Sequence, residues 1–339
     1  RTDLAMNIGG KTLDVTLRML ERYRIPIRRL EANGITGMCI MLDVEGRSCT
    51  IEPVTERPVA QRSKDLPMPT LSDIDRTIRS LKPIPQIALS IAEMISDDTT
   101  DLAGIASEIK KDQVLSADVL RLCNSAFLGV PRKIESIDEA VAVVGTSTLM
   151  QLVITAHMER LIGCSESGYS LMRGGLYFHS LATARLSERL ARASGVAGPQ
   201  TAYTCGLLHD IGKVVLDQYM AGVRPLFYRS SKVQGHDSST FERMIFGIDH
   251  SLAGFHLAEA WGLPAVVKDA VLFHHTPDGA SSDRVLMHVV RLADALSLTF
   301  LPGLVMENLD AASFEDSMLV LGLSPEKIQE SLSVLVNVY

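Results

Sequence analysis

The spacing of hydrophobic residues changes character along the chain. Over residues 12–23 leucines recur at helical intervals, whereas over residues 38–51 apolar and polar side chains alternate as they do in strands. Glu45 and Gly46 interrupt the alternating run and are typical of a tight turn. Residues 1–53 therefore predict a small α/β segment, with one amphipathic helix followed by strands that include a hairpin.

Residues 54–70 separate this segment from a helical remainder. They mix charged residues with three prolines and show no apolar period, which is typical of a linker. Beyond them, apolar residues recur at helical spacing almost without a break, and Gly145 is expected to separate two helices. The helices predicted in the first half are Ile84–Ile95, Leu102–Lys111 behind the cap Asp101, Ser116–Leu122, one begun by the capping box Ser136 and Glu139, and Thr146–Leu161.

The helices of the second half carry polar residues within or at the end of an apolar pattern, where burying a polar group costs free energy unless it has a partner. Those residues are His179, His250, His274, His275 and Asp294. The predicted fold class is mainly α, with two successive helical bundles, residues 71–165 and 166–339, after the α/β segment.

The composition of the 339-residue chain narrows the possible classes of protein. Hydrophobic residues make up 46%, and 33 basic against 40 acidic residues give a net charge of −7, which argues against nucleic acid as a main partner. The five cysteines form no CxxC, so they predict reduced thiols and no disulfide framework. No apolar run approaches the ~20 residues that span a bilayer, and no secretion signal opens the chain. These features predict a soluble, cytoplasmic protein, and because the chain begins with Arg1 we expect that further sequence precedes it.

The stretch TCGLLHDIGK, residues 204–213, carries the most distinctive chemistry. An apolar run ends in His209 and Asp210, and the helix is expected to break at Gly212, before Lys213. The dyad is too small a donor set for a metal, but polar residues of other helices can converge on it, as they do in helical bundles. Imidazole and carboxylate donors suit Fe, Mn, Zn or Ni. The sequence thus predicts a centre for one or two divalent ions, against the alternative of a vestigial site whose residues hydrogen-bond one another.

Two segments carry a resemblance to a known family. LKPIPQIALSIAEMISDDTTDLAGIASEIKKDQVLSADVLRLCNSAFLG and IESIDEAVAVVGTSTLMQLV, followed by the polar residues above, resemble the HDOD domain. The resemblance covers about residues 71–339 and implies a helical signalling module related to the HD phosphohydrolases. Such domains generally act by binding a ligand or a partner. HHTPD at residues 274–278 differs from the pattern of the HD-GYP cyclic di-GMP phosphodiesterases, so that substrate is not implied.

The same resemblance assigns the polar residues to two metal sites. The first site would contain His179, His209, Asp210 and Asp294. The second would contain His250 with His274, His275 or both, and Asp210 would bridge the two ions. If the domain is a hydrolase, the resemblance makes His209, Asp210 and Lys213 catalytic, with Lys213 on a phosphate oxygen.

The first segment resembles a different family. Residues 6–53, with the wording AMNIGGKTLDVTLRMLERYRIPI, resemble the C-terminal third of the chemoreceptor deamidase CheD. The Cys-His pair of that family would lie upstream of this segment, so no residue here inherits the activity. Cys39 and Cys49 have no nearby histidine in the sequence and are expected to be packed thiols.

Several other polar residues are expected to be structural. His157, His236, His256 and His288 are predicted to lie in the core or on the surface. Asn124 is expected to cap the end of the third helix and Asp249 to cap the helix of His250.

Three functions stay open from the sequence. The first is a regulatory protein that binds a signalling partner, which could be a chemotaxis component, or a nucleotide-like ligand. The second is a metal-dependent phosphohydrolase acting on a nucleotide or cyclic dinucleotide. The third is a receptor deamidase, which requires upstream sequence to supply the missing cysteine and histidine.

Overall fold

The computed structural model describes residues 38–43, 48–53, 69–81, 102–125, 128, 130, 132–163, 169, 174–195, 198–220, 223, 237–300 and 311–337. The chain forms two compact units, Arg1–Lys64 and Asp65–Tyr339. The division between these units falls inside the predicted linker, and the assignment of domains on either side stays a prediction.

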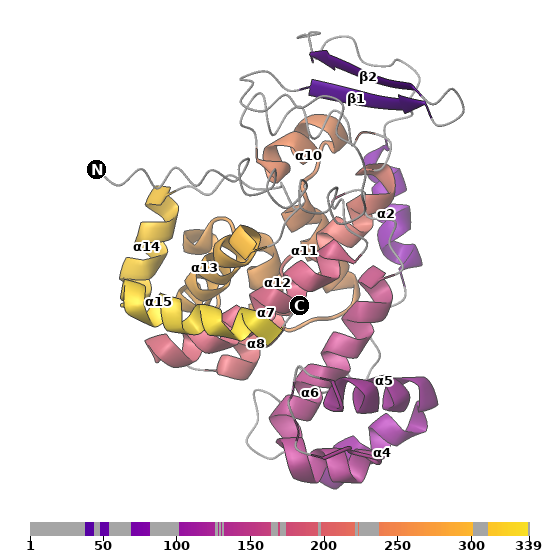
Figure 1. Ribbon diagram of the computed structural model, residues 1–339, viewed down its shortest axis with the longest axis vertical. Coiled ribbons are helices and arrows are strands. Elements are labelled where there is room, and N and C mark those ends of the chain that lie inside the picture. The colour runs from indigo at the N-terminus through magenta and orange to yellow at the C-terminus, as the bar shows by residue number, and fades with distance from the viewer. Residues whose placement is uncertain are drawn as a thin grey trace. The chain divides into compact units, whose positions relative to one another are not determined.

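The described part of the first unit is a β-hairpin. Strand β1, Met38–Asp43, pairs antiparallel with β2, Ser48–Pro53, and Ile40 lies opposite Ile51 (Figure 1). The alternating pattern and the turn residues therefore predicted this hairpin correctly. The amphipathic helix predicted over residues 12–23 lies outside the described residues.

The described part of the second unit is helical, which confirms the mainly α fold class (Figure 1). Its elements in chain order are α2 (Leu71–Ser80), α4 (Leu102–Lys111), α5 (Gln113–Cys123), α6 (Ile137–Gly163), α7 (Gly175–Ser194), α8 (Pro199–Leu208), the helical residues 212–220, α10 (Ser238–Phe246), α11 (His250–Ala260), α12 (Ala265–Phe273), the 3-10 helix η1 (Pro277–Gly279), α13 (Arg284–Phe300), α14 (Ala311–Leu321), α15 (Pro325–Leu332) and the 3-10 helix η2 (Ser333–Asn337).

Side-chain caps determine where two of the early helices begin. Thr70 and Asp73 form a capping box in which each side chain accepts a hydrogen bond from the other residue's backbone N–H. This box begins α2, a helix that we did not predict because Thr70 was assigned to the linker. Asp112 caps α5, which therefore begins before the expected Ser116. Helix α4 has its predicted bounds, whereas the helix predicted over Ile84–Ile95 lies outside the described residues.

Asn124 joins the end of α5 to the segment before α6. Its side-chain amide donates to the carbonyl oxygens of Leu120 and Ile134, both at 2.8 Å, and its side-chain oxygen accepts from the Ile134 N–H at 2.8 Å. The predicted capping role is therefore confirmed, and the same side chain also holds the connection that leads into α6.

Helix α6 consists of two helical stretches that meet at Gly145, where φ is 76° and ψ is 166°. Gly145 was expected to separate these stretches, and glycine tolerates this backbone conformation because it has no Cβ. At the start of α6, Ser136 accepts from the Glu139 N–H, while the Glu139 carboxylate accepts from the Glu135 N–H. Residues Ile137–Ile162 are long and apolar enough to cross a membrane by length and composition, but α6 packs against α4, α5, α7 and α8. It is a core helix of this unit.

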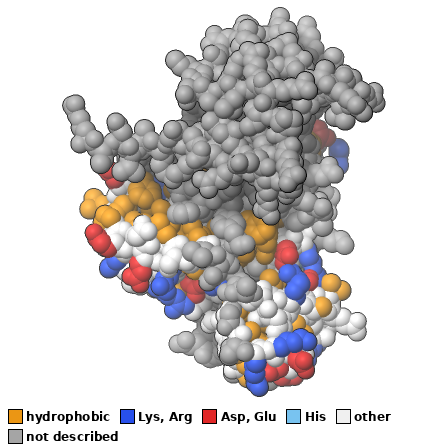
Figure 2. All heavy atoms as spheres, in the orientation of Figure 1, with side chains coloured by type: hydrophobic (Ala, Val, Ile, Leu, Met, Phe, Trp, Pro, Cys, Tyr) orange, Lys and Arg blue, Asp and Glu red, His pale blue; other side chains and the backbone are white. Residues whose placement is uncertain are grey.

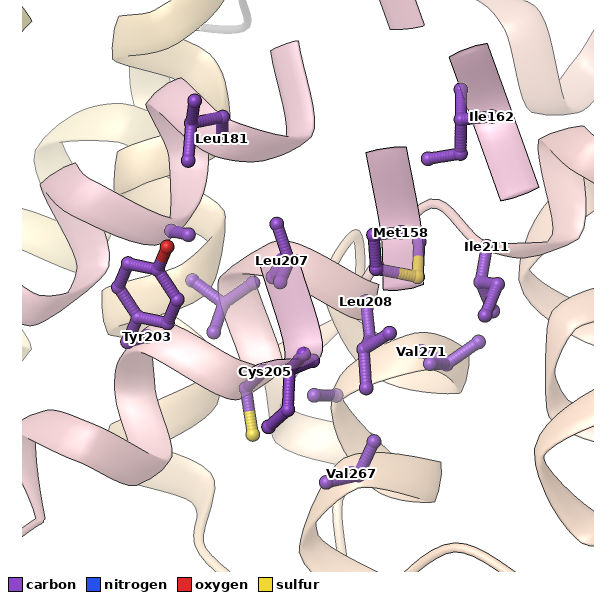
Figure 3. Close-up of a cluster of buried hydrophobic side chains, with 14 of the residues drawn as sticks. Met158, Ile162, Leu181, Tyr203, Cys205, Leu207, Leu208, Ile211, Val267 and Val271 are labelled. Carbon is purple, nitrogen blue, oxygen red and sulfur yellow. The ribbon is translucent and has the colours of Figure 1, made fainter. Parts of the chain in front are cut away.

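The core of the second unit is centred on α7 and α8. These helices pack against each other, α13 packs on both, and α6 and α12 pack against α8. Figure 3 shows aliphatic side chains from α6, α8 and α12 gathered in one cluster that includes Met158, Leu208 and Val271. Aliphatic contacts of this kind hold the helix ends that carry the polar residues in fixed positions.

The surface of the C-terminal helices is partly apolar. Leu319 and Val320 on α14 are 81% and 45% exposed, and Val285 on the neighbouring α13 is 41% exposed. Figure 2 shows hydrophobic side chains gathered over this region, whereas the surface of α4 to α6 mixes basic and acidic side chains.

Candidate metal centre

The His209-Asp210 dyad lies at a turn between two helices. Helix α8 ends at Leu208 with His209 as its C-cap, residues 209–211 form a turn, and a new helix begins at Gly212. Both side chains of the dyad are buried. The expected break at Gly212 was therefore misplaced, because the chain turns at the dyad itself.

Gly212 has a different role, which is to let two backbones approach closely. A Cβ added at Gly212 would lie 1.9 Å from the carbonyl oxygen of His250, and one added at Gly254 would lie 2.9 Å from the Gly212 nitrogen. The start of the helix after the dyad thus contacts α11 directly. This contact fixes the position of Asp210 relative to His250.

The first cluster joins the dyad to α7 and α13. The Nε2 atom of His179 lies 3.3 Å from Asp210 Oδ2 and 3.0 Å from Asp294 Oδ1. The Nε2 atom of His209 lies 3.4 Å and 3.5 Å from the same two oxygens. The four residues that the resemblance assigned to the first site are therefore brought together from separate parts of the chain.

The second cluster joins α11 to the end of α12. His250 Nε2 lies 3.0 Å from His275 Nε2 and 3.4 Å from His274 Nε2. The other oxygen of Asp210, Oδ1, lies 3.4 Å from His250 Nε2 and 3.7 Å from His274 Nε2. Asp210 thus presents one carboxylate oxygen to each cluster.

The inward-facing atoms fit a bound cation. His179 Nε2, His209 Nε2, Asp210 Oδ1 and Asp294 Oδ1 are buried and have no hydrogen-bond partner of acceptable geometry. Buried polar atoms without partners are rare, because each costs free energy. Three sets of possible ligand atoms lie here, each with its atoms within 4.8 Å of one another, as they do around a bound cation.

In His179, His209 and His274 the ring nitrogen that faces away from the centre, Nδ1, contacts a hydroxyl group or a backbone carbonyl oxygen. Nδ1 of His209 lies 2.8 Å from the Gly206 carbonyl oxygen, and Nδ1 of His274 lies 2.9 Å from that of Val271. A carbonyl oxygen can only accept, so each Nδ1 carries a proton and each Nε2 faces the centre. Orientation of this kind is usual for histidines that bind metals.

The charges of the two clusters differ. Burial lowers the pKa of His209, but the Asp210 and Asp294 carboxylates outweigh it and raise that pKa to about 10. In the second cluster, burial and then the neighbouring His250 lower the pKa of His275 to about 4. Protons on the first cluster balance its carboxylates, so a divalent cation there would displace protons. In the second cluster burial holds the pKa of His274 well below its usual value, whereas Glu242 raises the pKa of His250 against burial.

Comparison with known proteins identifies the family. The profile of the HDOD domain matches residues 81–277, which is more than half of the chain. The chain belongs to the HDOD domain family. An uncharacterised protein of Treponema pallidum (strain Nichols) is 27% identical over 307 residues, which cover 87% of this chain and 55% of that protein. The chain therefore spans little more than half the length of this relative.

Solved structures share the fold of this HDOD protein. An HDOD domain protein of unknown function from Geobacter sulfurreducens aligns with a TM-score of 0.63 at 24% identity and covers 79% of this chain and 99% of that chain. A proposed signal transduction protein from Marinobacter aquaeolei VT8 gives 0.63 at 23% identity, covering 79% and 58%. A proposed phosphohydrolase from Shewanella amazonensis SB2B gives 0.59 at 22%, covering 78% and 98%. At these identities the likeness establishes the fold.

Lys213 contacts the centre of the HDOD domain from the side of Asp210. Its side chain is 1% exposed, and Nζ donates to Asp210 Oδ2 at 2.6 Å. This ion pair helps to hold the pKa of Asp210 well below its usual range against burial, together with the positive charge of His209. The phosphate contact expected of Lys213 stays a prediction, and it would require this ion pair to change.

The other polar residues have structural environments where they are described. His256 is 51% exposed on its side chain, and Nδ1 of the buried His288 lies 3.2 Å from Ser317 Oγ. Asp249 caps α11 by accepting from the Leu252 N–H, as predicted. His236 and the side chains of Cys39 and Cys49 lie outside the described residues.

Two residues of the centre were missed in the sequence. Ser297 Oγ lies 2.9 Å from His179 Nδ1 and donates to the Asp294 carbonyl oxygen. Glu242, buried in α10, contacts His250. No comparable signal marks Glu242, because α10, SSTFERMIF, carries other polar residues beside it.

Proposed function

We propose that this HDOD protein is a bacterial regulatory protein whose HD-type centre binds one or two divalent metal ions, and that it acts by binding a ligand or a signalling partner. The observation that carries the proposal is the convergence of three buried ligand atoms, from His179, His209 and Asp294, beside an Asp210 carboxylate that presents one oxygen to each cluster. The Nε2 atoms of His179 and His209 each lie near both carboxylates, which is the arrangement of a ligand set around one cation.

The two clusters differ in the donor atoms that they would offer to a cation. His179, His209, Asp210 and Asp294 offer mixed nitrogen and oxygen donors, which suit Fe or Mn, whereas the three imidazoles of the second cluster also suit Zn or Ni. A bound metal would supply a Lewis acid and a water of lowered pKa. The residues of this chain supply the buried, oriented donors.

Regulation is favoured over turnover by the state of Lys213. In a metal-dependent hydrolase a lysine can bind phosphate oxygens beside the metal ions, and the resemblance assigned that role to Lys213. In the structure it is buried and donates to Asp210. A proposed signal transduction protein among the structural relatives is consistent with this preference.

The alternative function is a metal-dependent phosphohydrolase acting on a nucleotide or cyclic dinucleotide. The observation that favours it is the division of the Asp210 carboxylate, with Oδ2 toward the first cluster and Oδ1 toward the second. A bridging carboxylate between two metal ions is a usual feature of two-metal hydrolases. A structural relative described as a proposed phosphohydrolase agrees with this alternative.

Elemental analysis tests the metal centre. Protein purified without added metal or chelator is expected to contain at least one equivalent of a divalent metal. His209→Gln should lose it, whereas His288→Gln, which replaces a buried histidine outside the clusters, should retain it. Wild-type protein without metal after incubation with Fe, Mn, Zn and Ni would contradict the proposal.

A turnover assay separates the two functions. The metal-loaded protein is incubated with nucleotides, cyclic dinucleotides and a generic phosphodiester. We expect no release of product above that of Asp210→Asn. A rate that disappears in Asp210→Asn would establish the phosphohydrolase instead.

The CheD-like identity of residues 6–53, the link to chemotaxis and the cytoplasmic location stay predictions. The described part of this segment is the backbone of a hairpin, which is common to many folds. The sequence upstream of Arg1 would decide the deamidase hypothesis, because the activity requires a cysteine and a histidine there.

A further inference from the structure

Glu242 is a fully buried carboxylate on a helix that supplies no metal ligand. It lies on α10, and its exposed fraction is 0%. Burying a carboxylate is costly unless the group is paired and hydrogen-bonded. Its partners in the structure therefore indicate what this residue does.

One oxygen of Glu242 contacts His250 twice. Oε2 accepts a hydrogen bond from the His250 backbone N–H at 2.7 Å and lies 2.7 Å from the ring Nδ1 of the same residue. His250 is the first residue of α11, so its N–H is one of the donors that a helix start leaves unsatisfied. The backbone contact alone would complete the helix start. The ring contact is additional, and it turns Nε2 toward Asp210, His274 and His275.

The polypeptide positions Glu242 through a short reversal between α10 and α11. Helix α10 ends at Gly247, whose φ of 75° is accessible to glycine at little cost. Arg243 forms an ion pair with Asp249, the cap of α11. The reversal therefore brings the inward face of α10 against the first turn of α11.

Among His179, His209, His250 and His274, the histidine whose orienting group is charged is His250. His209 and His274 are oriented by backbone carbonyl oxygens, and His179 by the hydroxyl of Ser297. A carboxylate makes the imidazole that donates to it a stronger metal donor than a carbonyl does. It also adds a negative charge beside a cluster that consists of three histidines.

We propose that Glu242 is a positioning residue of the second metal position, and that it holds His250 with Nδ1–H toward α10 and Nε2 toward the centre. The inference rests on the proposed metal centre, and it gives the second metal position a charged residue, Glu242, that supports one of its ligands. The second position thereby gains a negative charge that its own histidines lack. The first position, with two aspartates, does not depend on Glu242.

The test uses two variants of the full chain and a matched control. Glu242→Gln keeps the shape and one acceptor oxygen but removes the charge, and Glu242→Met removes both. Asp269→Asn is the control, because Asp269 Oδ2 is also mostly buried and accepts from the backbone N–H of Ser281 and Ser282 but contacts no histidine of the centre.

The first measurement is Zn²⁺ and Mn²⁺ binding by competition with a chromophoric chelator. Glu242→Gln is expected to bind the second equivalent roughly 10–100-fold more weakly, with the first equivalent unchanged. Glu242→Met should lose the second equivalent, and Asp269→Asn should bind both as the wild type does.

The second measurement needs no metal. In metal-free wild-type protein, at a pH high enough for the His250 ring to be neutral, ¹⁵N NMR of that ring should show the tautomer with the proton on Nδ1. Glu242→Gln should retain this tautomer, whereas Glu242→Met should give a mixture. This readout separates orientation of the ring from a general loss of stability.

The outcomes distinguish this inference from the proposed function. If both variants bind two equivalents with wild-type affinity, the inference is overturned while the metal centre stands. If the wild type binds one equivalent only, the second position does not exist and the inference fails, again without loss of the first site. Wild-type protein that binds no metal overturns the proposed function itself.

Discussion

Replacing Gly212 with alanine tests how the two clusters of the metal centre are held together. A Cβ at this position would lie 1.9 Å from the His250 carbonyl oxygen and 2.5 Å from the Gly254 nitrogen. Both obstacles are backbone atoms, so no rotation of a side chain relieves the clash. Helix 212–220 and α11 would have to separate by about 1.5 Å to reach 3.4 Å, where ordinary contacts begin.

The size of the effect follows from two opposing contributions. Overpacking of a core costs typically ~1–3 kcal/mol, and a clash between backbones belongs at the top of this range. Alanine in place of glycine inside a helix recovers about 1 kcal/mol. We therefore expect Gly212→Ala to lower the free energy of unfolding by about 2 kcal/mol, which corresponds to a fall in Tm of roughly 4–8 °C.

The assay is thermal unfolding of the metal-free protein, followed by elemental analysis after loading with Mn²⁺. Separation of the helices moves Asp210 away from His250, so we also expect the second metal equivalent to be lost. Gly279→Ala is the comparison, because the atoms nearest to its Cβ all belong to the ring of Phe273, at 2.7 Å and beyond, on a side chain that can move. Gly212→Ala protein with the Tm and the metal content of the wild type would refute this account of the close approach.

Three further predictions concern other parts of the molecule. Asn124→Ala should lower the free energy of unfolding in urea by roughly 2–3 kcal/mol, because it removes three hydrogen bonds and leaves the Ile134 N–H unpaired; an unchanged midpoint would contradict this. Burial, followed by the charge of Arg160, lowers the pKa of His157 to about 4, so the unfolded chain takes up a proton between pH 6.5 and 4 that the folded chain does not. The free energy of unfolding should therefore fall by up to about 3 kcal/mol as the pH falls through this window, and His157→Leu should remove this fall. If the Tm of both proteins depends on pH to the same extent, His157 is not the cause. Removal of metal by a chelator should lower the Tm of the wild type, by the equivalent of about 2.7 kcal/mol if the metal was present at 100 times its Kd, and it should lower the Tm of Asp294→Asn less, because this variant keeps only the second cluster. A chelator effect of equal size in both proteins would place the metal elsewhere.

The helices near the centre were predicted in the sequence because their signals are local. Gly195 ends α7, Asp249 caps α11, and the leucines and valines between such signals recur at helical spacing. One local signal was overlooked. Thr70 was assigned to the linker, which contains three prolines, although Thr70 and Asp73 have the spacing of a capping box, and the structure shows that they form one.

The order of the polar residues along the sequence determined which side chains could form the centre. Asp294 was identifiable because it places a charge in an apolar helix, where a buried polar group requires a partner. His179 and the His209-Asp210 dyad were assigned with it because their order along the chain resembles that of the HD superfamily. This argument names the members of the site but gives no distances between them.

The tertiary structure alone decided how these residues are oriented and what supports them. Glu242 and Ser297 hold His250 and His179 through bonds between different helices, and Gly212 sets the separation of the two clusters through a contact with α11. Hydrogen-bond direction and close packing depend on the relative positions of elements that are distant along the chain. The sequence by itself therefore determined the helices and the donor set, whereas packing determined the two-cluster geometry, because packing is a property of pairs of helices and not of any one of them.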